Sequence, residues 1–181
     1  MDRNTVEILE KYIAGKDLDQ AEILEHIYLE NAEVLFEIKS ETISFPDKIR
    51  GNKEIARILS ADFNNKFDRV KTYYLSHHFD DIANLVINNQ SWLVVMREKA
   101  SNTVRVGAGY YDWAFEKLSN LELKIKKHKI FIGVMLEWKV PLETFYDLQN
   151  TLEYPWIEKE RVLHVLADFK GLEKLTNYLR N

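Results

Sequence analysis

The amino-acid sequence predicts an α+β fold, with helices on the concave face of a cone-shaped, highly curved antiparallel sheet of about six strands and further helices at the C-terminus. Two changes in periodicity predict it. Apolar residues recur at helical spacing up to residue 31, alternate with polar residues over most of residues 70–138, and return to helical spacing after Pro141. With 181 residues, 46% of them hydrophobic, the chain can form one core without a metal or a disulfide. We expect a domain over residues 1–140, with residues 141–181 as its helical extension.

The N-terminal segment, residues 4–31, predicts a helical hairpin. Val6, Leu9 and Ile13 recur at the spacing of one helix face. A second apolar stripe over residues 23–28 predicts another helix ending near residue 31.

Two short strands and a third helix should follow. Residues 34–38 alternate between apolar and polar side chains, and a second strand is expected over residues 43–49. Pro46 places this second strand at a sheet edge, because proline has no N–H to donate. Asn52 then caps a helix that extends to about Lys66.

The remainder up to residue 138 predicts four long strands. Short turns rich in asparagine and serine separate them, so neighbouring strands should be antiparallel. The strands are expected at Val70–Phe79, Ser91–Lys99, Thr103–Lys117 and Leu121–Trp138.

The C-terminal tail carries an apolar stripe that Gly171 divides into two helical pieces. This stripe must be buried, either over the mouth of the cone or against a second subunit. Tyr111, Trp113 and Phe115 share one parity of a long strand, and we expect them on the convex face. Large exposed aromatic residues mark interfaces, so the sequence predicts a homodimer.

Composition excludes several classes of function. There are 25 Lys+Arg against 29 Asp+Glu, and this net charge of −4 argues against a nucleic-acid partner. The run Lys124–Lys129 is interpreted as the solvent face of a strand. The absence of cysteine, of closely spaced histidine ligands and of a glycine-rich phosphate loop predicts no metal and no cofactor. Without a leader or a long apolar run, we expect a cytoplasmic protein with no membrane partner.

Short motifs in this order of elements resemble a known family. Phe45-Pro46 and Arg50–Ile55 precede the third helix, Ser76-His77-His78-Phe79 lies on the first long strand, and Val106–Asp112 lies on the third. Over residues 4–138 the chain is similar to the nuclear transport factor 2-like fold and its SnoaL-like branch, in particular to scytalone dehydratases and bile-acid dehydratases. The resemblance implies a conical pocket for a small apolar molecule. It also implies acid–base chemistry by a tyrosine, a histidine and a carboxylate, without a cofactor.

The resemblance assigns roles to individual residues. Tyr12 matches the family's tyrosine on the first helix, His78 its strand histidine, and Glu98 the carboxylate of the bile-acid enzymes. Two positions differ. Ile13-Ala14-Gly15 stands where an acid follows the tyrosine, and Ala108 stands where scytalone dehydratases have a second histidine.

Strand geometry limits which of these side chains can meet. Adjacent strand residues point to opposite faces, so His77 and His78 cannot chelate together, and Tyr74 shares the face of His78. An inward imidazole exchanges protons near neutral pH, and Glu98 or Asp112 would fix its tautomer. Alternatively, His78 is a hydrogen-bonded polar residue of the sheet and Asp112 a solvated charge.

We expect Tyr74, Trp92, Met96 and Tyr110 to contact a ligand, with Tyr12 as a hydroxyl donor or, alternatively, as a packed core residue. Two functions remain open. In the first, the protein binds a small hydrophobic molecule and isomerises, cyclises or dehydrates it, as a lyase or isomerase would. In the second, the same fold serves as a non-catalytic module for ligand binding or dimerisation.

Overall fold

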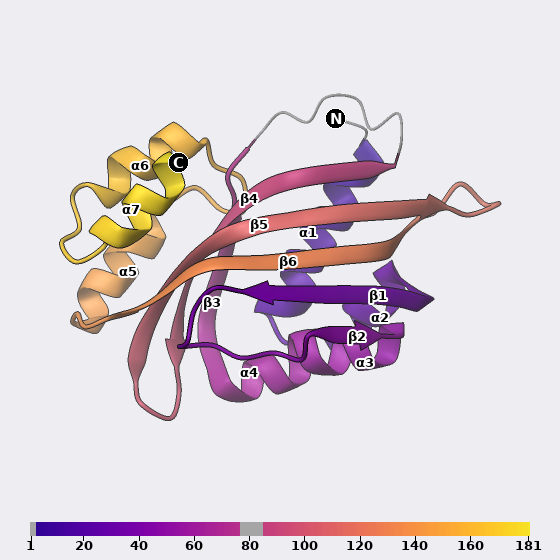
Figure 1. The fold of residues 1–181 in the computed structure, drawn as a ribbon, viewed down its shortest axis with the longest axis horizontal. Coiled ribbons are helices and arrows are strands. Elements are labelled where there is room, and N and C mark those ends of the chain that lie inside the picture. The colour runs from indigo at the N-terminus through magenta and orange to yellow at the C-terminus, as the bar shows by residue number, and fades with distance from the viewer. Residues whose placement is uncertain (1–2, 77–84) are drawn as a thin grey trace.

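The computed structural model describes residues 3–76 and 85–181 and shows an α+β fold (Figure 1). Its sheet carries helices on both faces, and the strand order is β2-β1-β6-β5-β4-β3. The predicted fold class is confirmed with one correction: β1 runs parallel to β6, so the sheet is mixed. The strands are β1 (Tyr28–Ile38), β2 (Lys48–Arg50), β3 (Phe67–Tyr74), β4 (Val86–Glu98), β5 (Thr103–Lys117) and β6 (Leu123–Trp138).

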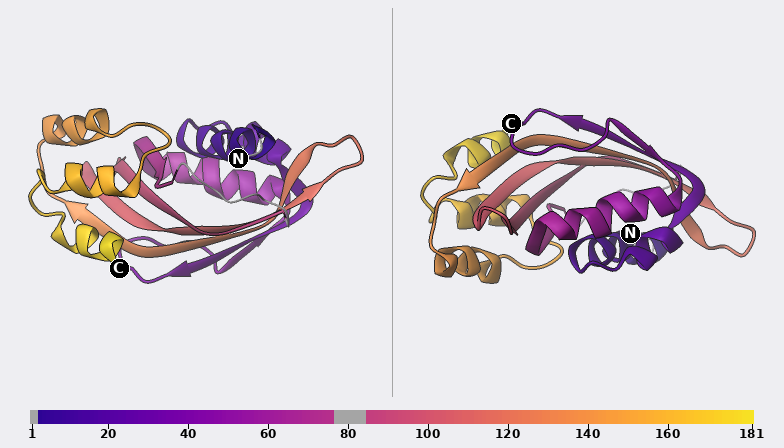
Figure 2. Two further views of the ribbon diagram at one scale, coloured as in Figure 1. Left: turned by 90° about the horizontal axis from the view of Figure 1, so that it is seen from above. Right: turned by 90° about the horizontal axis from the view of Figure 1, so that it is seen from below.

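Helices of the N-terminal half pack on the concave face of the sheet, as predicted (Figure 2). Leu9 and Ile13 of the first helix are buried there with Leu24 of the second. The predicted third helix is one continuous segment whose middle turn has π-helical geometry. These helices are α1 (Arg3–Asp17), α2 (Ala21–Ile27), α3 (Asn52–Ala56), the π-helix η1 (Arg57–Asp62) and α4 (Phe63–Lys66).

Several boundaries differ from the sequence prediction, among them the start of β4, which lies at Val86 and not at Ser91. Helix α2 ends at Ile27, because Tyr28 already has extended backbone dihedrals and pairs with β6. Strand β2 is confined to Lys48–Arg50, and the loop over residues 39–47 packs Phe45 against the concave core instead.

A β-bulge decides which residues of β6 face the concave core. Lys126 is an extra residue opposite the Ala114–Phe115 step of β5. Because a bulge shifts the alternation by one position, Ile125 and His128 both face the concave side. The prediction that the polar residues of the run Lys124–Lys129 face solvent is therefore wrong for His128.

The predicted faces of β5 are reversed. Tyr111, Trp113 and Phe115 lie in the concave core and not on the convex face. Tyr110 and Asp112 have the opposite parity and lie on the convex side. This orientation buries three large aromatic side chains. It therefore removes more apolar surface from water than an orientation with Tyr110 and Asp112 on the concave side would.

The C-terminal tail packs on the convex side of the sheet and forms a second hydrophobic cluster with it. The tail has three helices where the sequence predicted two pieces, and Gly171 separates the last two with a φ of +89°. Among the described residues, no helix is both long and apolar enough to span a membrane. The tail helices are α5 (Leu142–Thr151), α6 (Lys159–Leu166) and α7 (Glu173–Arg180).

The segment between α5 and α6 crosses the edge of the sheet at β3. The Tyr74 N–H donates to the Pro155 carbonyl over 2.7 Å, and the Ile157 N–H donates to the Tyr74 carbonyl over 3.0 Å. Trp156 packs on the Tyr74 ring at 4.6 Å and donates its indole N–H to Glu10 of α1 over 2.8 Å. This segment therefore protects an open strand edge and ties α1 to β3.

Candidate functional site

A cavity of about 50 Å³ lies between the concave face of the sheet and the helices that cover it. Most of its wall is apolar, with side chains from α1, η1, α4, the loop before β2 and five strands. The polar residues of the wall are Tyr12, Lys16, Thr72, Trp92 and Tyr111. An apolar cavity with a few converging polar groups is the usual form of a small-molecule site.

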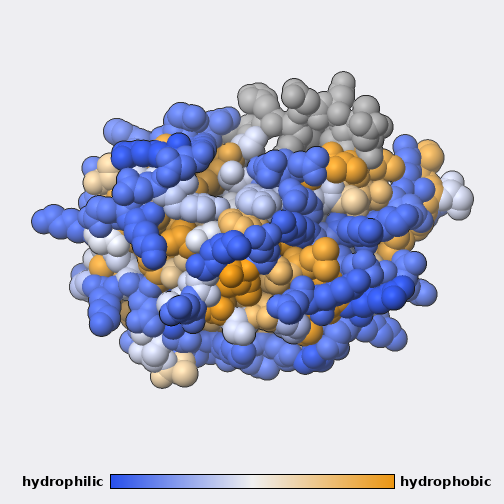
Figure 3. Space-filling model, viewed as in Figure 1, coloured by the Kyte–Doolittle hydropathy of each residue, from blue (hydrophilic) through white to orange (hydrophobic). Residues whose placement is uncertain are grey.

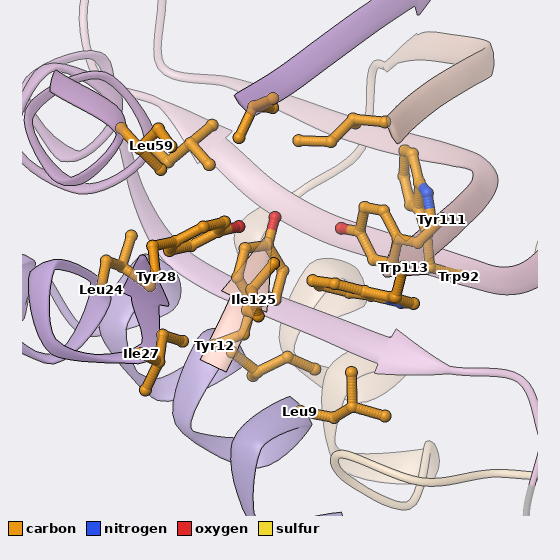
Figure 4. Packing of buried hydrophobic residues seen from close by; sticks show 14 of the residues in the cluster. Leu9, Tyr12, Leu24, Ile27, Tyr28, Leu59, Trp92, Tyr111, Trp113 and Ile125 are labelled. Carbon is orange, nitrogen blue, oxygen red and sulfur yellow. The ribbon is translucent and has the colours of Figure 1, made fainter. Parts of the chain in front are cut away.

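Tyr12 is held rigidly at this wall by aromatic neighbours. Its ring meets Tyr111, Trp113 and His128 edge to face, with centroids 5.6, 5.0 and 5.0 Å away. Figure 4 shows its hydroxyl between those of Tyr28 and Tyr111. Among the described residues, the buried Tyr12 hydroxyl has no hydrogen-bond partner of good geometry.

Burial raises the pKa of Tyr12, although the nearby Tyr111 hydroxyl opposes this rise. The Tyr12 side chain therefore stays protonated at neutral pH and acts as a hydrogen-bond donor.

Trp92 supplies a second donor to the cavity wall. Its indole stacks on the Tyr111 ring at 5.4 Å, and its buried Nε1–H has no acceptor within the described part of the chain. A buried donor without an acceptor costs about 1–3 kcal/mol, so two at one small cavity need an explanation.

The C-terminal end of α1 brings a charged pair to the cavity. The Lys16 ammonium donates to Asp17 over 2.6 Å and to Thr72 over 2.9 Å, and it lies 4.7 Å from the centroid of the Phe63 ring. Asp17 also accepts from the Thr72 N–H over 2.6 Å, and its side chain is fully buried. Such a network satisfies a buried carboxylate and directs the ammonium to the wall.

Side chains from the third helical segment fix this end of α1. Ser60 donates to the Gly15 carbonyl and Asn64 donates to the Lys16 carbonyl, each over 2.7 Å. These are carbonyls of the last turn, which lack partners inside the helix. The π-helix η1 thus positions the charged pair through Ser60.

His128 lies deeper in the concave core and is only 1% exposed. A hydrogen bond of 2.7 Å joins its Nδ1 to the Tyr28 hydroxyl, and its ring stacks on Trp113 at 3.7 Å. Burial lowers the pKa of His128 well below its usual value, so the ring is neutral at neutral pH. Its Nε2 atom has no partner among the residues described.

The structure brings together only part of the site expected from the sequence. Tyr12, Trp92 and Met96 line the cavity. Tyr74 is buried beside them and donates its hydroxyl to the Leu9 carbonyl over 2.9 Å. His78 lies outside the described residues, so its predicted role stays a prediction.

Tyr110, Glu98 and Asp112 do not line the cavity. Tyr110 stacks on Phe131 at 4.5 Å on the convex side. The Glu98 carboxylate accepts from Ser101 over 2.6 Å and from Arg105 over 2.8 Å, and these bonds lower its pKa. Asp112 accepts from the Asn89 N–H over 2.8 Å on the face away from the cavity. Expecting Tyr110 and Asp112 inside the cone was wrong because the parity of β5 is reversed.

Sequence reasoning missed His128 and the Lys16–Asp17 pair. His128 was hidden in a basic run whose alternation is broken by the bulge at Lys126. Asp17 was overlooked because the acid of the first helix was sought directly after Tyr12. A count along the helix gives a usable signal, since residues 12 and 16 are four apart and share one face. Among the described residues, no group of three or more metal-ligating side chains is found.

A curved sheet with helices in its concave face around a small cavity defines the nuclear transport factor 2-like fold, and solved structures bear this out. LinA superposes with a TM-score of 0.62 at 13% identity, over 76% of this chain and 88% of LinA. A putative scytalone dehydratase from Novosphingobium aromaticivorans gives 0.59 at 15% identity, over 77% and 88%. A nuclear transport factor 2-like superfamily protein from Salmonella enterica gives 0.58 at 10%, over 76% and 92%. No protein-family model and no curated protein matches the chain.

Proposed function

We propose that the protein binds a small, mostly apolar molecule whose polar group is a hydrogen-bond acceptor. The observation that carries this proposal is the pair of buried donors at the cavity wall, the Tyr12 hydroxyl and the Trp92 indole N–H, which lack acceptors among the described residues. One ligand oxygen or two would satisfy both donors and remove the free-energy penalty of leaving them unpaired.

The size and lining of the cavity restrict the ligand further. A volume of about 50 Å³ admits a small ring compound only if side chains of the wall move aside. Met96 and Met135 line it, and methionine side chains adapt readily to a larger guest. The ligand class is therefore a small ketone or a similar acceptor molecule with an apolar body.

A second candidate function adds catalysis to this binding, as a lyase or isomerase that needs no cofactor. The Lys16 ammonium favours it: lysine has three N–H donors, and two are used by Asp17 and Thr72. The third would stabilise negative charge that develops on a ligand oxygen, as an oxyanion site does. The superposition with a putative scytalone dehydratase supports the same reaction class, and His78 stays the proposed base.

The binding proposal can be tested with a matched pair of ligands, cyclohexanone and its hydrocarbon analogue methylenecyclohexane. We expect the ketone to bind about tenfold more tightly, because only the ketone accepts a hydrogen bond. In ¹⁵N-labelled protein the Trp92 indole N–H signal, assigned with Trp92→Phe, should move downfield with the ketone alone.

Tyr12→Phe should abolish the preference for the ketone, whereas Tyr178→Phe removes a hydroxyl from α7 on the convex side and should keep it. Equal affinity of the wild-type protein for the two ligands, or a preference that survives Tyr12→Phe, would overturn the proposal.

A further inference from the structure

The imidazole of His128 contacts Tyr12 on one side and Tyr28 on the other. The Tyr12 ring meets it edge to face at 5.0 Å and 89°, and Trp113 stacks beneath it at 3.7 Å and 11°. Trp113 also meets the Tyr12 ring, at 5.0 Å and 80°. The stacked pair His128 and Trp113 is therefore a flat platform that restricts rotation of the Tyr12 ring.

Tyr28 anchors this platform from outside the cavity. Its hydroxyl forms a 2.7 Å hydrogen bond with His128 Nδ1, and it does not line the cavity. Its side chain is buried in the concave core, and the residue is only 2% exposed. A phenol is the stronger acid of the two groups, so Tyr28 donates and Nδ1 accepts, and the imidazole proton is on Nε2.

We propose that Tyr28 and His128 are positioning residues for Tyr12: Tyr28 fixes the imidazole, and the imidazole with Trp113 holds the Tyr12 hydroxyl at the cavity wall. This inference rests on the proposed function for the role of Tyr12. According to this proposal, the selectivity of the cavity for an acceptor ligand depends partly on Tyr28, which does not line the cavity.

A purely structural role does not account for a histidine at this position. The groups that meet the ring are Tyr12 of α1, Tyr28 of β1, and Tyr111 and Trp113 of β5. Burial alone accounts for the lowered pKa of His128, with no charged side chain of the described residues contributing. An apolar side chain would fill this space without leaving Nε2 unpaired. What the imidazole adds is one directional anchor, its bond to Tyr28.

The test compares Tyr28→Phe with Tyr73→Phe, using cyclohexanone and methylenecyclohexane as probes. Tyr73 is a matched control, because it also donates a buried hydroxyl, over 3.3 Å to the Gln149 carbonyl, but on the convex side. We expect Tyr28→Phe to lower the preference for the ketone about 3- to 10-fold while the hydrocarbon affinity stays the same. The double variant Tyr12→Phe/Tyr28→Phe should lose no more than Tyr12→Phe alone.

A second measurement needs no ligand. Long-range ¹H–¹⁵N spectra of histidine-labelled protein should show His128 in the single Nε2–H tautomer, and this preference should be lost in Tyr28→Phe. His128→Asn, which keeps an acceptor for Tyr28 but not the ring, should also lose the ketone preference.

The outcomes separate the two proposals. A wild-type protein without a ketone preference overturns the proposed function, and this inference with it. A wild-type preference that depends on Tyr12 but survives Tyr28→Phe overturns this inference alone. Equal losses for both ligands would show that Tyr28 and His128 only support packing.

Discussion

At the scale of single residues, the concave core contains polar atoms that a core built only for stability would not keep. Tyr12, Trp92 and His128 each have one buried donor or acceptor atom without a partner among the described residues. Most buried polar groups in native proteins are satisfied, so a group of three points to function. Stability and binding should therefore respond in opposite directions to substitutions at these positions.

Tyr12→Phe tests this opposition directly. Because it removes an unsatisfied hydroxyl and leaves the ring in place, we expect the free energy of unfolding to stay the same or to rise by about 1 kcal/mol. Urea denaturation monitored by circular dichroism measures it. A loss of more than about 1 kcal/mol would show instead that the hydroxyl makes a stabilising bond.

His128 should make the protein sensitive to mild acid. Its pKa lies well below 6.5 in the folded protein and close to 6.5 in the unfolded chain, so between these values the unfolded chain binds more protons. Stability is then fully present above pH 6.5 and is lost as the pH falls toward the folded pKa. The slope approaches about 1.4 kcal/mol per pH unit.

Denaturation at several pH values from 7 to 5 checks this prediction, with His128→Asn as the reference. The variant should lack this part of the slope, whatever its stability at pH 7. Carboxylates with lowered pKa, such as Asp68 and Glu98, act only at more acidic pH and do not obscure the window. Parallel curves for the two proteins would contradict the assignment.

At the scale of elements, sequence reasoning identified the helices of the concave face and the long strands. It did not identify which side chains of each strand lie on the concave face. Alternation specifies two faces, and it does not say which one is concave when both are covered. Strand β5 has buried residues of both parities, because α1 packs on one side and the tail on the other. Tyr12 could be found from helical periodicity, whereas His128 could not, since a bulge breaks the period.

The contact between β6 and α7 depends on one glycine. A Cβ atom at Gly133 would lie 2.3 Å from the Tyr178 ring, which is far too close. Gly133→Ala should therefore displace Tyr178 and destabilise the protein by about 1–3 kcal/mol. In the Tyr178→Ala background the same substitution should cost much less, and a double-mutant cycle by thermal unfolding measures the difference. Equal costs in both backgrounds would place the strain elsewhere.

At the scale of the whole molecule, the tail covers part of the convex face and so limits which residues there can form an interface. Figure 3, which looks onto the sheet from the side away from α1, shows hydrophobic residues scattered among hydrophilic ones. The aromatic residues that motivated the homodimer, Tyr111 and Trp113, are buried in the concave core. The homodimer stays a prediction, and Tyr110 with Phe131, stacked and partly exposed, is the convex surface we propose for it.

Sedimentation at micromolar concentration decides this point, with Phe131→Glu as the interface variant. A charge placed in the centre of an interface should dissociate the dimer, because an unpaired buried charge is strongly unfavourable. A wild-type monomer, or a dimer unaffected by Phe131→Glu, would remove this surface from consideration.

The tail itself should be needed to keep the chain monodisperse. Its apolar residues, among them Phe145, Leu148 and Leu175, are fully buried against the convex face of the sheet. A chain ending at residue 140 would expose the sheet side of this cluster, including Leu93 and Val106, as a continuous apolar patch. We expect this chain to self-associate on size-exclusion chromatography, while the full chain elutes as one species. A truncated chain that elutes like a well-behaved monomer would show that the tail does not stabilise the sheet by covering it.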